Sequence, residues 1–172
     1  MKALVVVDFQ VDFVNGALGF EGAENLEPII ARKIEECRAA GGKVIFTFDT
    51  HGENYLETAE GRKLPIVHCI DGSAGHKLYG KIAECVKADD IVIKKPAFGS
   101  LELAEVLRKH NFDEVELCGL VTDICVVSNA MISKAALPEA KIVVDSSACG
   151  SGNKEGHAKA LDVMRGVQID VV

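Results

Sequence analysis

Short apolar runs recur along the chain and predict buried β-strands. The runs are rich in Val and Ile, and most are continuous rather than alternating with polar residues, which is typical of strands covered on both faces of a sheet. The six runs are Ala3–Val7, Val44–Phe48, Ile91–Ile93, Val115–Cys118, Ile142–Val144 and Val167–Val172.

Segments between these runs carry apolar residues at the three-to-four spacing of amphipathic helices. We expect helices over Leu26–Ala40, Ser100–His110, Thr122–Ala136 and Asn153–Arg165. This strand–helix alternation predicts an α/β fold, a Rossmann-like three-layer α/β/α sandwich with a doubly wound, mostly parallel six-stranded sheet. Residues 52–81 are the exception, and a long irregular excursion of this kind is usually functional.

Composition narrows the class of protein. A chain of 172 residues, 48% hydrophobic and 26% charged, fits one domain spanning 1–172. The net charge of −7 argues against a nucleic-acid surface, which needs clustered Lys and Arg. No apolar window approaches the ~18 residues of a membrane span, and the run 3–7 is too short for a signal peptide. The six cysteines form no CxxC pair, and because the sequence shows no secretion signal, we expect reduced thiols and a cytoplasmic protein.

Chemically useful side chains follow several of the predicted strands. Asp8 and Asp49 end the first two runs, Lys94 and Lys95 follow the third, and residues 122–125 come after the fourth. Ligands of open parallel sheets bind outside the carboxyl ends of the strands. We therefore expect an acid, a base and a thiol to meet at one edge of the sheet.

Cys125 lies near the start of a predicted helix, just after a Gly-containing turn. The N–H groups and partial positive charge of a helix N-terminus stabilise a thiolate and can hold an oxyanion. Asp8 could take the thiol proton, and Lys95 could keep the pair charged. The alternatives are ordinary ones: a buried structural cysteine, a turn-forming Asp and a solvated loop Lys.

A second cluster offers one carboxylate and two imidazoles from Asp49, His51 and His68. Three protein ligands with open positions suit a catalytic Zn²⁺, with iron or manganese as alternatives at higher coordination. The other interpretation is one capping Asp and two loop histidines. The remaining histidines are expected at the surface: His76, His110 and His157.

The glycine-rich segment 150–156 nearly matches the glycine motif of a dinucleotide-binding turn. Its third glycine is one residue late, and the segment lies far from the first strand–turn–helix unit, where this fingerprint normally occurs. We interpret it as a flexible turn before a helix and expect no nucleotide cofactor.

Three stretches of the chain resemble the isochorismatase-like cysteine hydrolases, and within that family they look most like nicotinamidases. They are ALVVVDFQVDF at 3–13, CGLVTDICVVSNA at 118–130 and DSSACG at 145–150. The stretch GLVTDICV is the most specific, because family members carry a G-x-x-T-D-x-C-V motif with the nucleophilic Cys at that position. The resemblance implies an isochorismatase-like fold over nearly the whole chain.

A catalytic triad of Asp8, Lys95 and Cys125 is implied by the same resemblance. In the family, the third strand runs from an acidic residue through apolar positions to the catalytic Lys. Counting five residues from Asp90 favours Lys95 over Lys94. Adjacent side chains of a strand point to opposite faces, so we expect Lys94 to point away.

The segment FTFDTHGENY…LPIVHCIDGSAGH resembles the nicotinamidase metal segment, whose ligands match Asp49, His51 and His68. The resemblance further implies an oxyanion site formed by N–H groups near Val121 and Cys125, with a non-proline cis peptide between Val121 and Thr122. Two departures concern the substrate. Nicotinamidases usually have Trp after the metal-binding Asp, whereas position 50 is Thr and the chain has no Trp; the loop after the catalytic Lys is also shorter and reads KPAFGS. The expected pocket walls are Phe13, Tyr55 and Phe98.

Together these features predict a cysteine-nucleophile amidohydrolase that converts nicotinamide and water to nicotinate and ammonia through a thioester. The cofactor implied is a divalent metal, zinc above iron or manganese, and the assembly implied is a homo-oligomer. Another amidase acting on a carbamoyl or ureido group is the main alternative. A non-catalytic ligand-binding protein is a second, and a thiol sensor using Cys118 or Cys149 as its resolving cysteine is a third.

Overall fold

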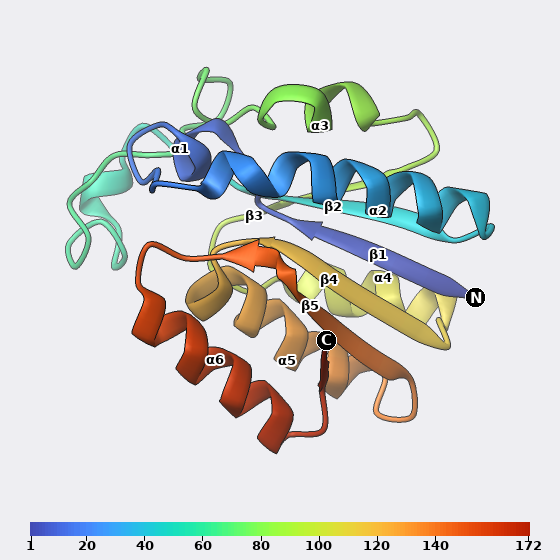
Figure 1. Ribbon diagram of the computed structural model, residues 1–172. Helices are drawn as coiled ribbons and strands as arrows, with labels where there is room; N and C mark the ends of the chain where they lie inside the picture. Colours follow the sequence, from blue (N-terminus) through green and yellow to red (C-terminus); the bar gives the residue numbers. More distant parts are fainter.

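A six-stranded, fully parallel sheet forms the middle layer of the computed structural model, which describes all residues 1–172 (Figure 1). The strand order is β3-β2-β1-β4-β5-β6. The strands are β1 Lys2–Val7, β2 Lys43–Asp49, β3 Ile91–Lys95, β4 Glu114–Leu120, β5 Lys141–Gly150 and β6 Asp170–Val171. The predicted three-layer α/β fold is confirmed.

Helices cover both faces of the sheet (Figure 1). In that view, α1, α2 and α3 lie above the sheet, and α4, α5 and α6 lie below it. The helices are α1 Val11–Val14, α2 Glu27–Ala39, α3 Gly80–Cys85, α4 Leu101–His110, α5 Val127–Ala136 and α6 Lys154–Gly166. Single helical turns occupy Ala23–Leu26, Tyr55–Glu57 and Thr122–Val126, the last with π-helical hydrogen bonding.

The alternation of side chains along β1 divides the hydrophobic core in two. Ala3, Val5 and Val7 belong to the cluster beneath the sheet, which includes residues of α4, α5 and α6. Leu4 and Val6 belong to the cluster on the α2 side. Because both faces of this central strand are buried, its sequence is a continuous apolar run, as the pattern predicted.

Several element boundaries differ from the sequence-based prediction. Helices α1 and α3 were not predicted, because 4 and 6 residues are too few to show a helical period. Strand β5 runs to Gly150, since Cys149 and Gly150 pair with Gly119 and Leu120 of β4 beyond a register shift. Strand β6 has only 2 residues. The predicted helix 122–136 begins as the π-turn and becomes α-helical at Val127.

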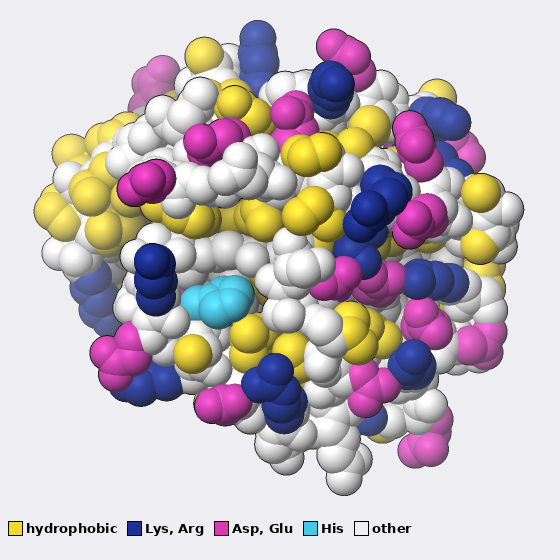
Figure 2. All heavy atoms as spheres, in the orientation of Figure 1, with side chains coloured by type: hydrophobic (Ala, Val, Ile, Leu, Met, Phe, Trp, Pro, Cys, Tyr) yellow, Lys and Arg dark blue, Asp and Glu magenta, His cyan; other side chains and the backbone are white.

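The described surface mixes charges. On the face shown in Figure 2, acidic and basic side chains are interspersed, and hydrophobic side chains gather around the segment 53–67. Leu56, Ile66 and Val67 contribute exposed apolar surface there. None of the helices has the length and apolar character needed to cross a membrane.

Candidate active site

The candidate active site lies where the winding of the sheet reverses. Strand β1 pairs with β2 on one side and with β4 on the other, so the connections after β1 and β4 diverge. A crevice at such a point is the usual ligand site of open α/β sheets. Asp8 directly follows β1, and the turn carrying Cys125 follows β4.

Asp8 is completely buried at the end of β1. Its backbone has φ 44°, an uncommon conformation for a residue with a side chain and one that often marks functional sites. Thr47 holds the carboxylate by donating from Oγ1 to Asp8 Oδ1 at 2.6 Å. The second oxygen, Oδ2, has no partner with good hydrogen-bond geometry, although it lies 2.6 Å from the Lys95 ammonium. This oxygen is therefore free to accept another proton.

Lys95 brings its buried ammonium group to the centre of the site from the last position of β3. Its Nζ lies 3.3 Å from Asp49 Oδ1 and 3.5 Å from Cys125 Sγ, and it donates to the Ala97 carbonyl at 3.0 Å. Lys94 points to the other side of the strand, where it pairs with an exposed carboxylate. The structure thus brings Asp8, Lys95 and Cys125 together and leaves Lys94 outside.

Cys125 is 3% exposed and sits within the π-turn after β4. The lysine Nζ is a hydrogen-bonding partner of its sulfur, and the cysteine forms no disulfide. Asn129, one turn later, donates from Nδ2 to the carbonyls of Cys125 and Phe98 at 2.8 and 3.0 Å. Its Oδ1 accepts from the backbone of Ser100 at 3.0 Å, so this amide ties the turn carrying Cys125 to the loop after β3. Sequence reasoning missed Asn129, whose only signal was a polar residue in an apolar helix.

Burial and neighbouring charges shift the pKa values of all three groups. Burial raises the pKa of the Cys125 thiol well above its usual range, the Asp8 charge adds to this, and Lys95 opposes it. Burial also raises the pKa of Asp8, with Lys95 acting against it. Burial disfavours the Lys95 ammonium, but the charges of the Asp8 and Asp49 carboxylates raise the net pKa of Lys95. The result is a neutral thiol beside a carboxylate whose raised pKa makes it a stronger base.

A four-residue cluster adjoins the triad: Asp49, His51, Glu60 and His68 present ligand atoms within 4.8 Å of one another. Asp49 Oδ2 lies 3.0 Å from His51 Nε2 and 3.4 Å from His68 Nε2. Glu60 Oε1 lies 3.7 Å from both imidazole nitrogens. Glu60 was not predicted, because it lies in the irregular segment 52–81, where a Glu has no distinguishing pattern.

These residues fit a zinc ion by their donor chemistry, two imidazole nitrogens and two carboxylates. The Nδ1 of His68 contacts the carbonyl of Ile66 at 2.7 Å. A carbonyl can only accept, so Nδ1 carries the proton and Nε2 keeps its lone pair for the cluster. Gln10 fixes the backbone of Asp49 from both sides, donating to its carbonyl at 3.0 Å and accepting from its N–H at 2.8 Å.

The expected pocket residues separate into two groups. Phe98 lines a cavity of about 450 Å³ beside the metal cluster and is 41% exposed. The cavity is also lined by His51, Thr58, Ala59, Glu60, Lys63, Leu64, Pro96 and Ala97. Tyr55 and Phe13 do not line it; they are buried and pack behind the imidazoles, with ring centroids 5.0 and 5.6 Å from His68.

Three further expectations need correction. The non-proline cis peptide joins Leu120 to Val121, one bond before the predicted position between Val121 and Thr122. His76 is buried rather than at the surface, because its ring packs near Phe48 and contacts a threonine hydroxyl. His157 is half-buried and contacts Thr122.

Comparison with known proteins identifies the family. The isochorismatase domain model matches residues 2–172. The chain belongs to the isochorismatase family. An uncharacterised isochorismatase family protein of Bacillus subtilis, PncA, is 33% identical over 93% of this chain and 92% of its own length.

Solved structures of the family superpose closely on the chain. The pyrazinamidase/nicotinamidase of Streptococcus mutans has a TM-score of 0.89 at 27% identity, over 100% of both chains. The pyrazinamidase of Pyrococcus horikoshii in complex with zinc has a TM-score of 0.87 at 26% identity, over 99% of this chain and 98% of its own. The N-carbamoylsarcosine amidase of Thermoplasma acidophilum has a TM-score of 0.83 at 25% identity, over 99% and 94%.

Proposed function

We propose that this isochorismatase-family hydrolase is a nicotinamidase-like amidohydrolase with Cys125 as nucleophile. The observation that carries the proposal is the contact of one buried ammonium, that of Lys95, with the Asp8 carboxylate at 2.6 Å and the Cys125 sulfur at 3.5 Å. The neighbouring metal cluster and the similarity to pyrazinamidase/nicotinamidase structures support a cyclic carboxamide as the substrate.

Asp8 acts first as a base in the proposed mechanism. Its Oδ2 takes the proton of the Cys125 thiol, and the sulfur attacks the amide carbon. Backbone N–H groups near Val121 and Cys125 hold the oxyanion, and Lys95 stabilises the charged groups. When the C–N bond breaks, Asp8 returns the proton to the departing ammonia and a thioester remains.

Water then hydrolyses the thioester. Asp8 takes a proton from the attacking water, the C–S bond breaks, and the sulfur leaves with its electron pair and recovers the proton. The products are one carboxylic acid and one ammonia for each amide and water consumed. Asp8 thus accepts and returns a proton in each of the two steps. Burial raises the pKa of Asp8, and a raised pKa suits a carboxyl group that acts as both base and acid.

A zinc ion would be held by Asp49, His51, Glu60 and His68. When bound, it supplies a Lewis acid that can fix a ring nitrogen of the substrate. Lys95 contacts both Asp49 and Asp8, so the chain's own residues place the metal cluster directly against the nucleophile's base.

Cys125→Ala tests the nucleophile. We expect ammonia release from nicotinamide to fall by at least about 10³-fold, because the residual rate then comes only from binding and polar stabilisation. Cys37→Ala is the matched control, a thiol of similar burial at 4% exposure on α2. Ammonia release by Cys125→Ala at the control's rate would overturn the assignment.

Carbamoyl amides are the second candidate substrates, because the N-carbamoylsarcosine amidase structure also superposes closely and no Trp is present for a pyridine ring. Comparing ammonia release from nicotinamide and from N-carbamoyl amino acids separates the two. A protein that releases ammonia from neither, with Cys125 unreactive to alkylation, would instead be a non-catalytic binding member of the fold.

We also propose that the protein is a single-domain, cytoplasmic homo-oligomer. The exposed apolar side chains of Leu56, Ile66 and Val67 support self-association, because exposed apolar surface of this kind is often buried at protein contacts. Sedimentation velocity of the intact chain tests the assembly, and a monomer at micromolar concentration would refute it.

A further inference from the structure

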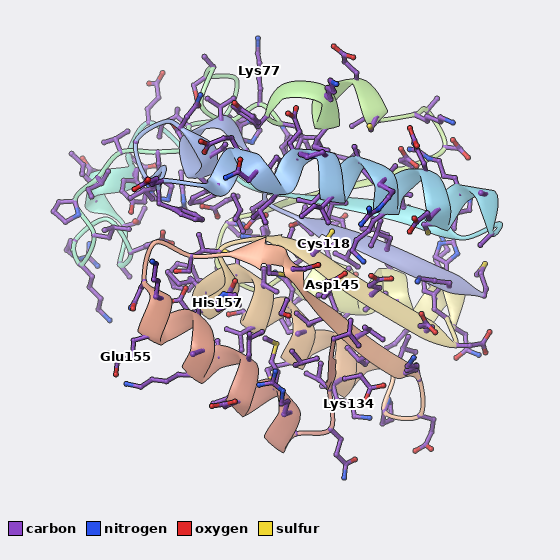
Figure 3. The ribbon with its side chains drawn as sticks, viewed as in Figure 1. Lys77, Cys118, Lys134, Asp145, Glu155 and His157 are labelled. Carbon is purple, nitrogen blue, oxygen red and sulfur yellow. The ribbon has the colours of Figure 1, made fainter.

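A polar contact links the nucleophile turn to the last long helix. Thr122, the first residue of the π-turn, is completely buried. Its Oγ1 lies 2.9 Å from Nδ1 of His157, which is half-buried in the first turns of α6. Figure 3 shows His157 pointing from α6 into the molecule, whereas Glu155 on the same helix points outward. A buried hydroxyl needs a partner, and His157 supplies it.

The neighbouring residue packs against the same helix. Asp123 fills the space next to Gly156, where an added Cβ would collide with the Asp123 carboxylate. Its Oδ1 is buried without a hydrogen-bond partner, near the N-terminus of α6, whose N–H groups favour negative charge. Asn153 caps that terminus by accepting from Gly156 N at 2.9 Å. The start of α6 is therefore shaped to receive the start of the nucleophile turn.

The position of the sulfur depends on this turn. Cys125 comes three residues after Thr122, and its Sγ must lie at 3.5 Å from the Lys95 ammonium. Asn129 holds the far end of the turn through the Cys125 carbonyl. At the near end, the contact with His157 is the side-chain hydrogen bond that anchors the turn. Displacing a reacting atom by about 1 Å can cost up to about 100-fold in rate.

We propose that His157 is a positioning residue that acts through the Thr122 hydroxyl to hold Cys125 in line with Lys95 and Asp8. This inference rests on the proposed nucleophile but not on any particular substrate. His157 itself touches none of the triad, so removing its ring nitrogens should alter reactivity through geometry, without changing the charge pattern beside the sulfur.

Two deletion variants and two conservative variants test the proposal. Thr122→Val removes the hydroxyl, and His157→Phe removes the ring nitrogens while keeping a ring. Thr122→Ser keeps the hydroxyl, and His157→Asn places an amide nitrogen close to the position of Nδ1. Glu155→Gln is the control on α6, because its exposed side chain points away from the turn.

The measurements are alkylation of Cys125 by iodoacetamide, followed by peptide mass spectrometry, and steady-state ammonia release. We expect both deletion variants to slow alkylation and to lower kcat about tenfold, the loss of one hydrogen bond, with KM changed less than about threefold. Thr122→Ser, His157→Asn and the control should stay within about threefold of the wild type. The double variant should be no slower than the slower single variant, since both remove the same contact.

The outcomes separate this inference from the proposed function. Slow alkylation in the deletion variants, in a protein that hydrolyses neither class of amide, would support the positioning role and refute the substrate. Wild-type alkylation and kcat in His157→Phe would overturn the positioning role and leave the substrate assignment intact. Additive losses in the double variant would also overturn it. Circular dichroism of each variant confirms that it is folded, and the conservative pair keeps the test valid if Thr122→Val does not fold.

Discussion

Glu60 adds a second carboxylate to the candidate metal site that it forms with Asp49, His51 and His68. Without an ion, the two carboxylates repel each other. Burial raises the pKa of Glu60, and the Asp49 charge raises it further. A divalent cation would reverse this effect, because it attracts both charges. A single side chain thus makes the cluster unfavourable when empty and favourable when loaded.

Glu60→Gln should therefore have opposite effects on the two states. We expect zinc affinity to fall at least about tenfold, because a charged ligand becomes a weakly coordinating amide. The melting temperature of the metal-free protein should stay equal or rise. Isothermal titration with zinc and thermal melts with and without zinc measure both effects. Glu57→Gln, in the same segment, is the control, since its side chain is exposed and lies outside the cluster. Unchanged zinc affinity in Glu60→Gln would exclude Glu60 as a ligand.

A glycine in strand β4 allows this strand to lie close to β1. Gly119 has φ 116°, a conformation that residues with a side chain rarely adopt. A Cβ there would collide with the carbonyl oxygen of Val7 on the neighbouring strand. The close approach of β4 to β1 brings the turn carrying Cys125 to the end of the strand that precedes Asp8. The glycine of the G-x-x-T-D-x-C-V motif thus has a backbone role beside the thiol's chemical one.

Gly119→Ala should destabilise the fold by at least about 2 kcal/mol, because it adds both backbone strain and a steric clash. Urea unfolding followed by circular dichroism measures the change. Gly166→Ala serves as the control, since an added Cβ at the end of α6 meets nothing within 4 Å. That variant should lie within about 1 kcal/mol of the wild type. Equal stability of the two variants would contradict the close-approach argument.

At the scale of the whole molecule, an ion network joins α2 to the sheet on the side opposite α4, α5 and α6. Lys33 of α2 pairs with Glu116 of β4 at 2.7 Å and with Asp145 of β5. Lys2 of β1 pairs with Glu116 at 2.5 Å. Burial opposes ionisation of both acids, but the ammonium groups hold the pKa of Glu116 and of Asp145 below their ordinary values. The network replaces apolar packing where α2 crosses toward β5.

Lys33→Met should lower stability by about 2 kcal/mol at pH 7, between the values for exposed and fully buried pairs. The ordinary pKa values of Glu116 and Asp145 are 4.5 and 3.8, and both are lowered in the folded protein. These carboxylates therefore stabilise the fold when the pH is above the ordinary values, and the contribution is lost as the pH falls through the folded-state pKa. The difference from the wild type should therefore shrink below about pH 4. Urea unfolding at several pH values measures it. Lys159→Met, in an exposed pair, should show less than about 0.5 kcal/mol at any pH.

The predicted elements were confirmed where the hydrophobic pattern extends over several residues or helical turns. The first four strand runs and the helices α2, α4 and α6 were located to within a few residues, because burial of one or both faces leaves a local pattern in the sequence. Short elements such as α1 and α3 were not predicted, since their position depends on contacts with distant loops. The predictions for the cis bond and for His76 were wrong for the same reason, because neither feature affects the hydrophobic pattern of the sequence.

By itself, the sequence determined the layered α/β architecture, the family motif and the identity of Asp8, Lys95 and Cys125 as candidates. Only the tertiary structure decided that one ammonium touches Asp8, Asp49 and Cys125 together, because that meeting depends on the order of strands in the sheet. It also added Glu60 and His157, whose partners lie 8 to 35 residues away in the sequence. Local pattern records which face of an element is buried, whereas long-range packing selects the partner that each polar group meets.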